Sequence, residues 1–547
     1  MPSDLLIIGI YLALMFTAGI FFSRNIKNTA DYFLAARSAP WFWIMGAVWA
    51  TNIGFLHGYL AHGGAAYEWG LVQANFEWFQ GPFAYILTGL FFIAFYWRAG
   101  IFTVPQFLER RYGSTIRLVY CLAWLVIFVV TIAAELYLGG MFLKNILHIP
   151  FWPTVLVLTV VVGTYTLLGG LGAAIMMEFV QFVIMMVGTM PLVFILLNMT
   201  GGFAGIKSVL LEQWNVSEQY FMVLPDIHHP YGPGPWVIMA LCFVVSLGWC
   251  AGHQSMVQRN LGARSLYDAK LGYVVAGIPK TLGAFLYIVP MLAAPIIFAR
   301  QGIFVEKADA AYHKLILNLL PSGMLGLFIA GLLSAGLSSI GSVLNSSSTM
   351  IVKDLYERYL VKGKSDHHYF VAGRWATFGI IVVSLSLVQI VSKSPLIMWL
   401  EQTLLAMLLG PFTAVLMLGI FWRRTNTAGG TTGFLVGCGF AVFMQRILGI
   451  NIFMLIGWWS FVVAFTTTVV VTLLTEPPEE EKVEGITWES DFHAKVGAII
   501  EERAENNGTR VTAMPDIVIT MPPWYLNLKY WATGILAVQI ALLFFFG

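Results

Sequence analysis

The chain has 547 residues, of which 59% are hydrophobic and only 11% are charged, and its mean hydropathy is +0.79. Soluble domains are roughly 45–50% apolar and about 25% charged, so this composition excludes a soluble enzyme. The net charge of +2, with no long block of Lys or Arg, gives no electrostatic basis for binding nucleic acid. We therefore expect an integral membrane protein.

Apolar stretches long enough to cross the roughly 30 Å hydrocarbon core of a bilayer recur along nearly the whole chain. They predict an all-α fold with about fourteen transmembrane helices. The first stretch has no basic region before it and no cleavage site after it, so we expect it to stay in the protein rather than act as a signal peptide. The glycine-rich run 169–172 is expected to join two spans. The expected spans are 4–23, 41–63, 79–97, 118–143, 150–168, 174–199, 235–255, 272–298, 320–350, 370–391, 396–421, 430–448, 452–474 and 527–546.

Lys and Arg are distributed unequally between alternate loops, with about 17 in one set and about 7 in the other. The positive-inside rule places the richer set in the cytoplasm, which puts both termini outside. The polar stretch 475–526, before the last helix at 527–547, would then be a cytoplasmic loop that is partly disordered. We expect the plasma membrane as the location, or the inner membrane in a bacterium.

Two spans contain small and polar residues in the middle of an otherwise apolar sequence. Residues 49–54 read Trp-Ala-Thr-Asn-Ile-Gly, and residues 249–254 read Trp-Cys-Ala-Gly-His-Gln. Irregular backbone at membrane depth is tolerated only where protein covers it or where it lines a cavity. Two such segments, five spans apart, are typical of an inverted-repeat transporter with a site near the membrane midplane. The alternative is that Gly and Asn simply let helices pack closely.

The ninth span is rich in hydroxyl side chains. Ser338, Ser342 and Asn345 share one helical face, and Ser339 lies beside it. Hydroxyls, together with carbonyls freed from a broken helix, can form the cage of hard oxygens that a small cation prefers. Alternatively, each hydroxyl can bond to the carbonyl one turn earlier and serve packing alone.

Ionisable side chains within membrane spans are costly to bury, so each one is a functional hypothesis by default. Each could instead be satisfied by a purely structural partner. Sequence distance alone pairs none of them. They are His57, Glu77, Glu135, Glu178, His253, Lys280 and Glu401.

Short motifs follow one another in order between about Tyr32 and Gly437. Together they resemble the sodium/solute symporter family, and within it the sodium/glucose cotransporter branch. The resemblance implies two inverted five-helix repeats, at 41–199 and 235–421, with flanking helices at 1–24, 430–474 and 527–547. The motifs are Asp31–Arg37, Asn52–Gly54 with His57, Phe76–Trp78, Phe102–Leu108, Tyr165–Leu171, Gln254 with Gln258–Arg259, Ser338–Ser339, Leu344–Ser346, Lys353–Tyr356 and Phe421–Arg424.

The resemblance also implies where the ligands bind. Sodium would bind the backbone carbonyls of Ala50, Ile53 and Ala335 and the hydroxyls of Ser338 and Ser339, and a candidate second ion would lie at Glu178 and Ser342. Carboxylate, ammonium and imidazole groups can all hydrogen-bond to sugar hydroxyls, while an aromatic ring covers the apolar face of a sugar. The expected solute-binding residues are Asn52, His57, Glu77, Trp249, His253, Gln254, Lys280, Gln402 and Thr403.

The chain departs from the family pattern at several of these positions. His253 stands where sugar transporters carry an amide or an acid, and Thr403, with Gln402 adjacent, stands where they carry a glutamine. Gly341 replaces a hydroxyl-bearing residue, and Glu178 replaces an aspartate; the missing hydroxyl weakens the case for a second ion. Solute identity and stoichiometry are therefore less firmly implied than the sodium site.

We expect a sodium-coupled symporter, not an enzyme, that imports a sugar or polyol by alternating access. Its partners would be sodium, the solute and the lipid bilayer, and we expect it to act as a monomer. One alternative is a symporter for an organic anion or another small metabolite, which His253 and Lys280 would suit by supplying positive charge. Another is a transporter-like sensor, which is disfavoured because the chain ends at Gly547 with no signalling domain.

Overall fold

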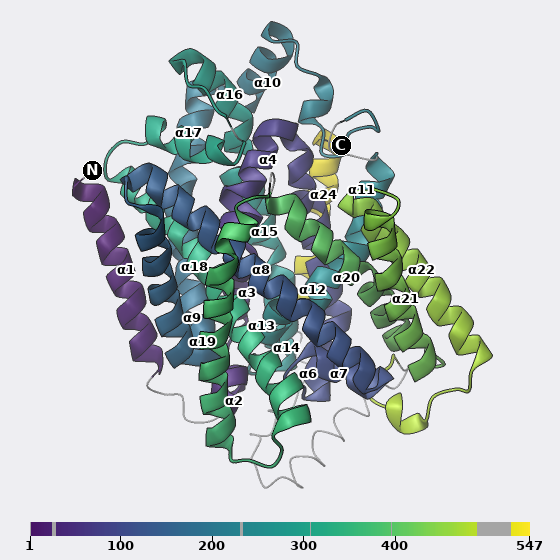
Figure 1. Cartoon of the computed structure of the whole chain (residues 1–547). Coiled ribbons are helices and arrows are strands. Elements are labelled where there is room, and N and C mark those ends of the chain that lie inside the picture. Colours follow the sequence, from purple (N-terminus) through teal and green to yellow (C-terminus); the bar gives the residue numbers. More distant parts are fainter. Residues whose placement is uncertain are drawn as a thin grey trace.

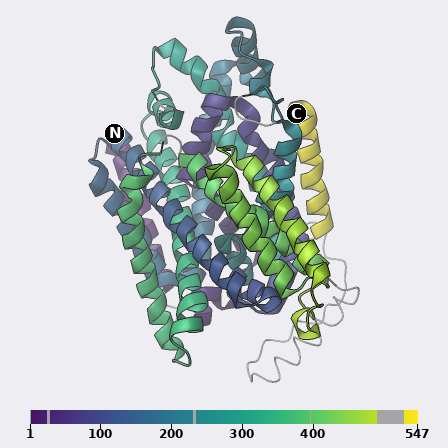
Figure 2. The ribbon, with the colours of Figure 1, turned by 45° about the vertical axis from the view of Figure 1, so that its right-hand side comes forward.

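The structure is a computed structural model that describes residues 2–23, 29–229, 234–306, 308–394, 397–488 and 527–546. Over these residues it is helical and contains no strand, which confirms the predicted all-α class. The helices form one bundle with most axes running along the same direction (Figures 1 and 2). Residues 489–526, which make up most of the expected cytoplasmic loop, lie outside the described residues.

The helices follow one another with short connections, and short irregular helical segments continue several of them. The α-helices are α1 (Pro2–Ser23), α2 (Thr29–Leu34), α3 (Trp41–Asn52), α4 (Ala61–Trp69), α5 (Gly81–Leu87), α6 (Ile93–Ala99), α7 (Val104–Tyr112), α8 (Ser114–Leu147), α9 (Phe151–Thr200), α10 (Gly202–Ser208), α11 (Pro235–Leu241), α12 (Leu247–Gly252), α13 (Gln254–Leu261), α14 (Leu266–Val275), α15 (Gly277–Tyr287), α16 (Val289–Gln301), α17 (Ala311–Leu319), α18 (Met324–Met350), α19 (Asp366–Val391), α20 (Ile397–Phe421), α21 (Thr427–Arg446), α22 (Phe453–Leu474) and α24 (Leu528–Phe546).

Twelve helical stretches among the described residues are long and apolar enough to cross a membrane, so the expected count of fourteen is not confirmed. The difference arises because two pairs of expected spans each fall in one continuous stretch, at Phe55–Trp97 and in α9. The 50 residues of α9 would extend about 75 Å if straight, more than twice the thickness of the hydrocarbon core. Gly170 (φ 49°, ψ −158°) breaks this stretch within the glycine run that was expected to join two spans.

Both predicted helix breaks are present. The first follows α3, where Ile53 (φ −116°, ψ 121°) and Gly54 are extended and the next segment, Phe55–Tyr59, contains non-helical backbone at His57 and Gly58. The second separates α12 from α13 at His253 (φ −66°, ψ 112°). Each break frees backbone groups deep inside the bundle, where protein must cover them. The repeat boundaries at 41–199 and 235–421 stay a prediction.

Helix α18 forms the centre of the bundle and is buried along almost its whole length. It packs against α9, α8, α1 and α3, because small side chains let these helices approach closely. At the crossing with α9, a Cβ added to Gly188 would lie 2.7 Å from the carbonyl oxygen of Leu327 and 3.3 Å from the Cα of Gly331. Helix α18 is therefore packed closely against α9 at this crossing.

The outer helices expose apolar side chains such as Leu14, Trp375 and Phe544, which is typical of a surface covered by lipid. Both ends of the described chain lie towards the same end of the bundle (Figures 1 and 2). At the N-terminal end, Asp4 accepts hydrogen bonds from the first backbone amides of α18. At the C-terminal end, the carbonyl of Phe546 accepts one from the amide of Val223 at 2.7 Å.

Candidate functional site

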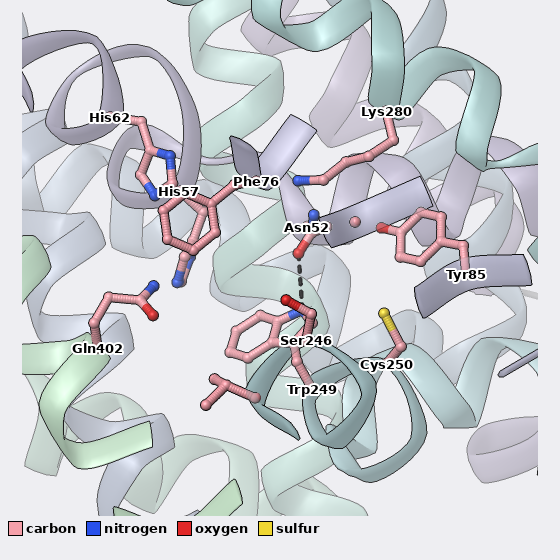
Figure 3. Close-up of a pocket in the computed structure, with 12 residues that line it drawn as sticks. Asn52, His57, His62, Phe76, Tyr85, Ser246, Trp249, Cys250, Lys280 and Gln402 are labelled. Atoms are coloured by element: carbon pink, nitrogen blue, oxygen red, sulfur yellow. Dashed lines mark hydrogen bonds between the residues drawn. The ribbon is translucent and has the colours of Figure 1, made fainter. Parts of the chain in front are cut away.

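A cavity of about 70 Å³ lies where the two broken helices meet (Figure 3). Five of the nine expected solute-binding residues line it, contributed by both broken helices, α15 and α20. Its lining residues are Asn52, His57, His62, Phe76, Gly81, Tyr85, Val245, Ser246, Trp249, Cys250, Lys280 and Gln402. We call this space the central cavity.

The two ionisable residues of the expected set that line the central cavity both have carboxylate partners. Lys280 Nζ lies 2.6 Å from Oε1 of Glu77, which is fully buried. His57 Nε2 lies 2.7 Å from Oε2 of Glu401, whose other oxygen accepts a hydrogen bond from Thr131. A buried charge that loses its partner is strongly destabilising, so these pairs tie together helices that are distant in the sequence. At each of these two positions the cavity therefore presents a compensated pair rather than an isolated charge.

Trp249 connects the two broken helices directly. Its indole Nε1 donates a hydrogen bond of 2.9 Å to Oδ1 of Asn52, drawn as a dashed line in Figure 3. The imidazole of His57 lies beside the same indole, with ring centroids 5.2 Å apart. The indole thus presents an aromatic surface to the cavity while its polar edge is held, an arrangement suited to covering the apolar face of a ring-shaped solute.

Four expected solute-binding residues do not line the central cavity. Glu77 reaches it only through its pair with Lys280. His253 hydrogen-bonds Ser255 and packs its ring against Trp124 and Trp249, so it supports the cavity from behind. The amide of Gln254 bonds the backbone at residues 102 and 104, just before α7. Thr403 donates to the carbonyl of Trp399 one turn earlier. It is the neighbouring Gln402 that lines the cavity.

Two polar residues that the sequence analysis did not single out also line the central cavity. Among the described residues, neither ring nitrogen of His62 nor the hydroxyl of Tyr85 has a hydrogen-bond partner. Buried polar groups are nearly always hydrogen-bonded, so these atoms are available to a ligand. A usable signal was present, because both residues fall inside expected apolar spans.

Three of the five expected sodium ligands lie together. The Ser338 hydroxyl oxygen lies 2.8 Å from the carbonyl oxygens of both Ala50 and Ala335. A hydroxyl has one proton and can donate it to only one of these carbonyls at a time, so these oxygens suit a small cation. The expected set also includes Ile53 and Ser339, and we call all five residues the oxygen cage.

The candidate second ion position is occupied by a protein cation. Arg259, on α13, places its Nη2 at 2.5 Å and its Nε at 3.1 Å from the two carboxylate oxygens of Glu178. Ser342 donates to the same carboxylate at 2.6 Å and also hydrogen-bonds Thr51 on α3. Both carboxylate oxygens are thus already engaged by a fixed positive charge.

Comparison with known proteins agrees with this arrangement. Residues 32–437 match the sodium:solute symporter family. The sodium/glucose cotransporter of Vibrio parahaemolyticus is 27% identical, over 81% of this chain and 85% of its own length. The sodium/myo-inositol cotransporter 2 of Mus musculus is 28% identical, over 80% of this chain and 69% of its own. The structure of a Na⁺-coupled sialic acid symporter shares the fold, with a TM-score of 0.75 over 87% of this chain and 98% of its own, at 20% identity. The chain belongs to the sodium:solute symporter family.

Proposed function

We propose that this chain imports a neutral polyhydroxy solute, a sugar or a polyol, together with sodium. The observation that carries this proposal is the pairing of Lys280 with Glu77 and of His57 with Glu401 across the central cavity. Because each positive group already has a carboxylate partner, the cavity offers hydrogen bonds without an uncompensated charge. Relatives named for glucose and myo-inositol support the same solute class.

The proposed solute contacts are the side chains that line the central cavity. Asn52, Gln402 and Ser246 can donate and accept hydrogen bonds, as solute hydroxyls also do. His62 and Tyr85 add atoms that no protein group satisfies among the described residues. Glu77 acts through its pair with Lys280, and His253 through its stacking beneath Trp249.

Sodium is proposed to bind in the oxygen cage. The helix break at Ile53 separates Ala50, which faces the cage, from His57, which faces the central cavity. An ion that fixes this break would hold the cavity wall in its binding geometry, which makes solute affinity depend on sodium. The membrane potential then contributes about 2.3 kcal/mol per charge per 100 mV to solute uptake.

The size of the central cavity supports alternating access. Its volume of about 70 Å³ is far below the roughly 300 Å³ at the lower end of small-molecule pockets. The walls would therefore separate to admit a sugar, with the two helix breaks as the proposed hinges. We place the Lys- and Arg-rich loops in the cytoplasm of a cell whose plasma membrane, or bacterial inner membrane, holds the protein with both termini outside.

A panel of ligands tests the proposal directly. The thermal unfolding midpoint of the purified protein is measured with sugars, polyols and organic acids, each in sodium chloride and in choline chloride. A ligand that binds the native state raises the midpoint by mass action, so we expect a sugar or polyol to stabilise the protein only with sodium. Stabilisation by an organic acid alone would replace the proposed solute class, and no response to sodium would reject the ion site.

A further inference from the structure

One buried carboxylate near the oxygen cage differs from the others. Glu135, on α8, is fully buried and faces the break after α3. Its Oε2 accepts a hydrogen bond from the amide of Phe55 at 2.8 Å, and its Oε1 accepts one from Leu56 at 3.4 Å. A Cβ added to Gly54 would lie only 2.1 Å from Oε1. The carboxylate is thus in close contact with the backbone at the break.

No ion pair joins Glu135 to a cation among the described residues; His57, which is paired with Glu401, acts on it electrostatically. By contrast, the buried carboxylates of Glu77, Glu178 and Glu401 each lie within 2.7 Å of a Lys, Arg or His nitrogen. Two backbone amides stabilise an anion but do not neutralise it, and an unpaired charge in a low-dielectric interior is costly. A cation bound nearby would therefore stabilise the ionised form of this carboxylate.

The oxygen cage lies beside this unpaired carboxylate. Ser339, a member of the cage, interacts electrostatically with Glu135. Every ligand in the cage is a neutral carbonyl or hydroxyl, so the cage alone does not balance the charge of sodium. The carboxylate of Glu178, on the other side of α18, is already neutralised by Arg259.

We propose that Glu135 is the counter-charge of the bound sodium ion. Its carboxylate accepts a hydrogen bond from the Ser339 hydroxyl. This orients the lone pairs of the Ser339 oxygen towards the ion. The same carboxylate holds the amides of Phe55 and Leu56, directly before His57 in the central cavity. Glu135 is therefore a positioning residue that links the ion to the solute-binding wall. This inference rests on the proposed sodium site.

The test is a sodium titration of the thermal unfolding midpoint, with the full chain and with Glu135→Gln. The glutamine keeps the size of the side chain and an oxygen that accepts from Phe55, but it removes the charge. We expect the half-saturating sodium concentration to rise tenfold or more, while the midpoint in choline chloride stays the same or increases. An unchanged sodium titration overturns the inference. If the midpoint in choline chloride also falls while sodium affinity is unchanged, Glu135 has a merely structural role.

Asp354→Asn is the matched control, because it also removes a fully buried carboxylate, but one that Arg117 already pairs. Its half-saturating sodium concentration should stay within about twofold of wild type; an effect as large as that of Glu135→Gln overturns the inference. If Glu135→Gln yields no folded protein, Glu135→Asp replaces it. The aspartate draws the charge back by one methylene, so a severalfold rise supports the inference and an unchanged titration overturns it. If the wild-type protein itself does not respond to sodium, the proposed function has failed instead.

Discussion

Two buried carboxylates flank the serine-rich face of α18 and have opposite surroundings. Glu178, from α9, accepts a hydrogen bond from Ser342 and two more from Nε and Nη2 of the Arg259 guanidinium. Glu135, from α8, lies beside Ser339 and has no such partner among the described residues. The residue type, the depth and the contact with a serine are the same. Only the source of the balancing positive charge differs.

The Glu178–Arg259 ion pair is permanent, whereas the proposed interaction of Glu135 with sodium is exchangeable. The Arg259 guanidinium is part of α13 and cannot diffuse away from Glu178. It therefore links α13 to α9 wherever this ion pair is kept. A sodium ion beside Glu135 can enter and leave, so the helix break after α3 can be firm with the ion and loose without it. Transport needs both kinds of joint, because one part must stay rigid while another moves.

The largest expected effect follows from removing the tethered cation. Arg259→Met leaves Glu178 buried without its partner, which should cost about 3–5 kcal/mol of folding free energy. A much lower thermal unfolding midpoint in choline chloride would show this cost. The double variant Arg259→Met with Glu178→Gln should recover most of it, because the orphaned charge is gone. A single variant as stable as wild type would break the comparison.

The second effect concerns the oxygen cage. Ser338→Ala and Ser339→Ala each remove one sodium ligand, so each should raise the sodium concentration for half-maximal uptake by tenfold or more, or about 1.4 kcal/mol. Ser347→Ala is the control, since this buried serine on the same helix only bonds back to Val343 at 2.7 Å. Equal sodium dependence in all three variants would count against the cage.

A third substitution separates solute from ion. Glu77→Gln removes the charge that pairs with Lys280 and should weaken solute binding by roughly tenfold or more, because a bare ammonium disfavours a neutral solute. The sodium titration should change little, since Glu77 is not part of the oxygen cage. Solute-dependent and sodium-dependent midpoints measured on one preparation give both numbers. Intact solute affinity would remove Glu77 from the site.

A smaller effect is expected where the two broken helices touch. Trp249→Phe keeps an aromatic ring in the central cavity but removes the hydrogen bond to Asn52. A bond of this kind is worth about 1 kcal/mol, so solute affinity should fall severalfold. Competition binding in saturating sodium measures the loss. A fall as large as that of Glu77→Gln would show that the indole itself, rather than the cavity charges, dominates recognition.

The smallest effect is expected at Glu109, a carboxylate that lies nearer the surface than those discussed above. Burial tends to raise the pKa of Glu109, on α7, but Arg117 and Arg358 outweigh it and hold that pKa below its ordinary value. The contribution of these pairs to stability is therefore complete above the ordinary glutamate pKa and is lost as pH falls through the lowered one. The midpoint difference between wild type and Glu109→Gln should be a few degrees at pH 7 and shrink in acid. A pH-independent difference would contradict this assignment.

Much of the architecture was predictable because burial in a bilayer leaves a direct trace in composition. Long apolar stretches mark the helices, and the polar interruptions at 49–54 and 249–254 mark both breaks. The break at Gly170 falls within the expected junction, but the count of fourteen is not confirmed, because Phe55–Trp97 and α9 are each one continuous helical stretch. Within the site, Ser338 could be chosen because hydroxyls spaced along one helix are unusual. His62 and Tyr85 also fall inside expected apolar spans, but only the folded chain shows that they line the same cavity.

The sequence by itself determined the helical class, the two breaks and the set of costly ionisable residues, since each depends on local composition and on the absence of water in the bilayer. Tertiary structure decided which of these residues pair. Lys280 and Glu77 are 203 positions apart, and Arg259 and Glu178 are 81 apart, so no periodicity connects them. It also decided that Gln402 rather than Thr403 lines the cavity, because the rotation of a helix about its axis is set by packing. Glu135 was visible in the sequence as a costly charge, but only the folded chain shows that backbone amides, rather than a contacting cation, hold it.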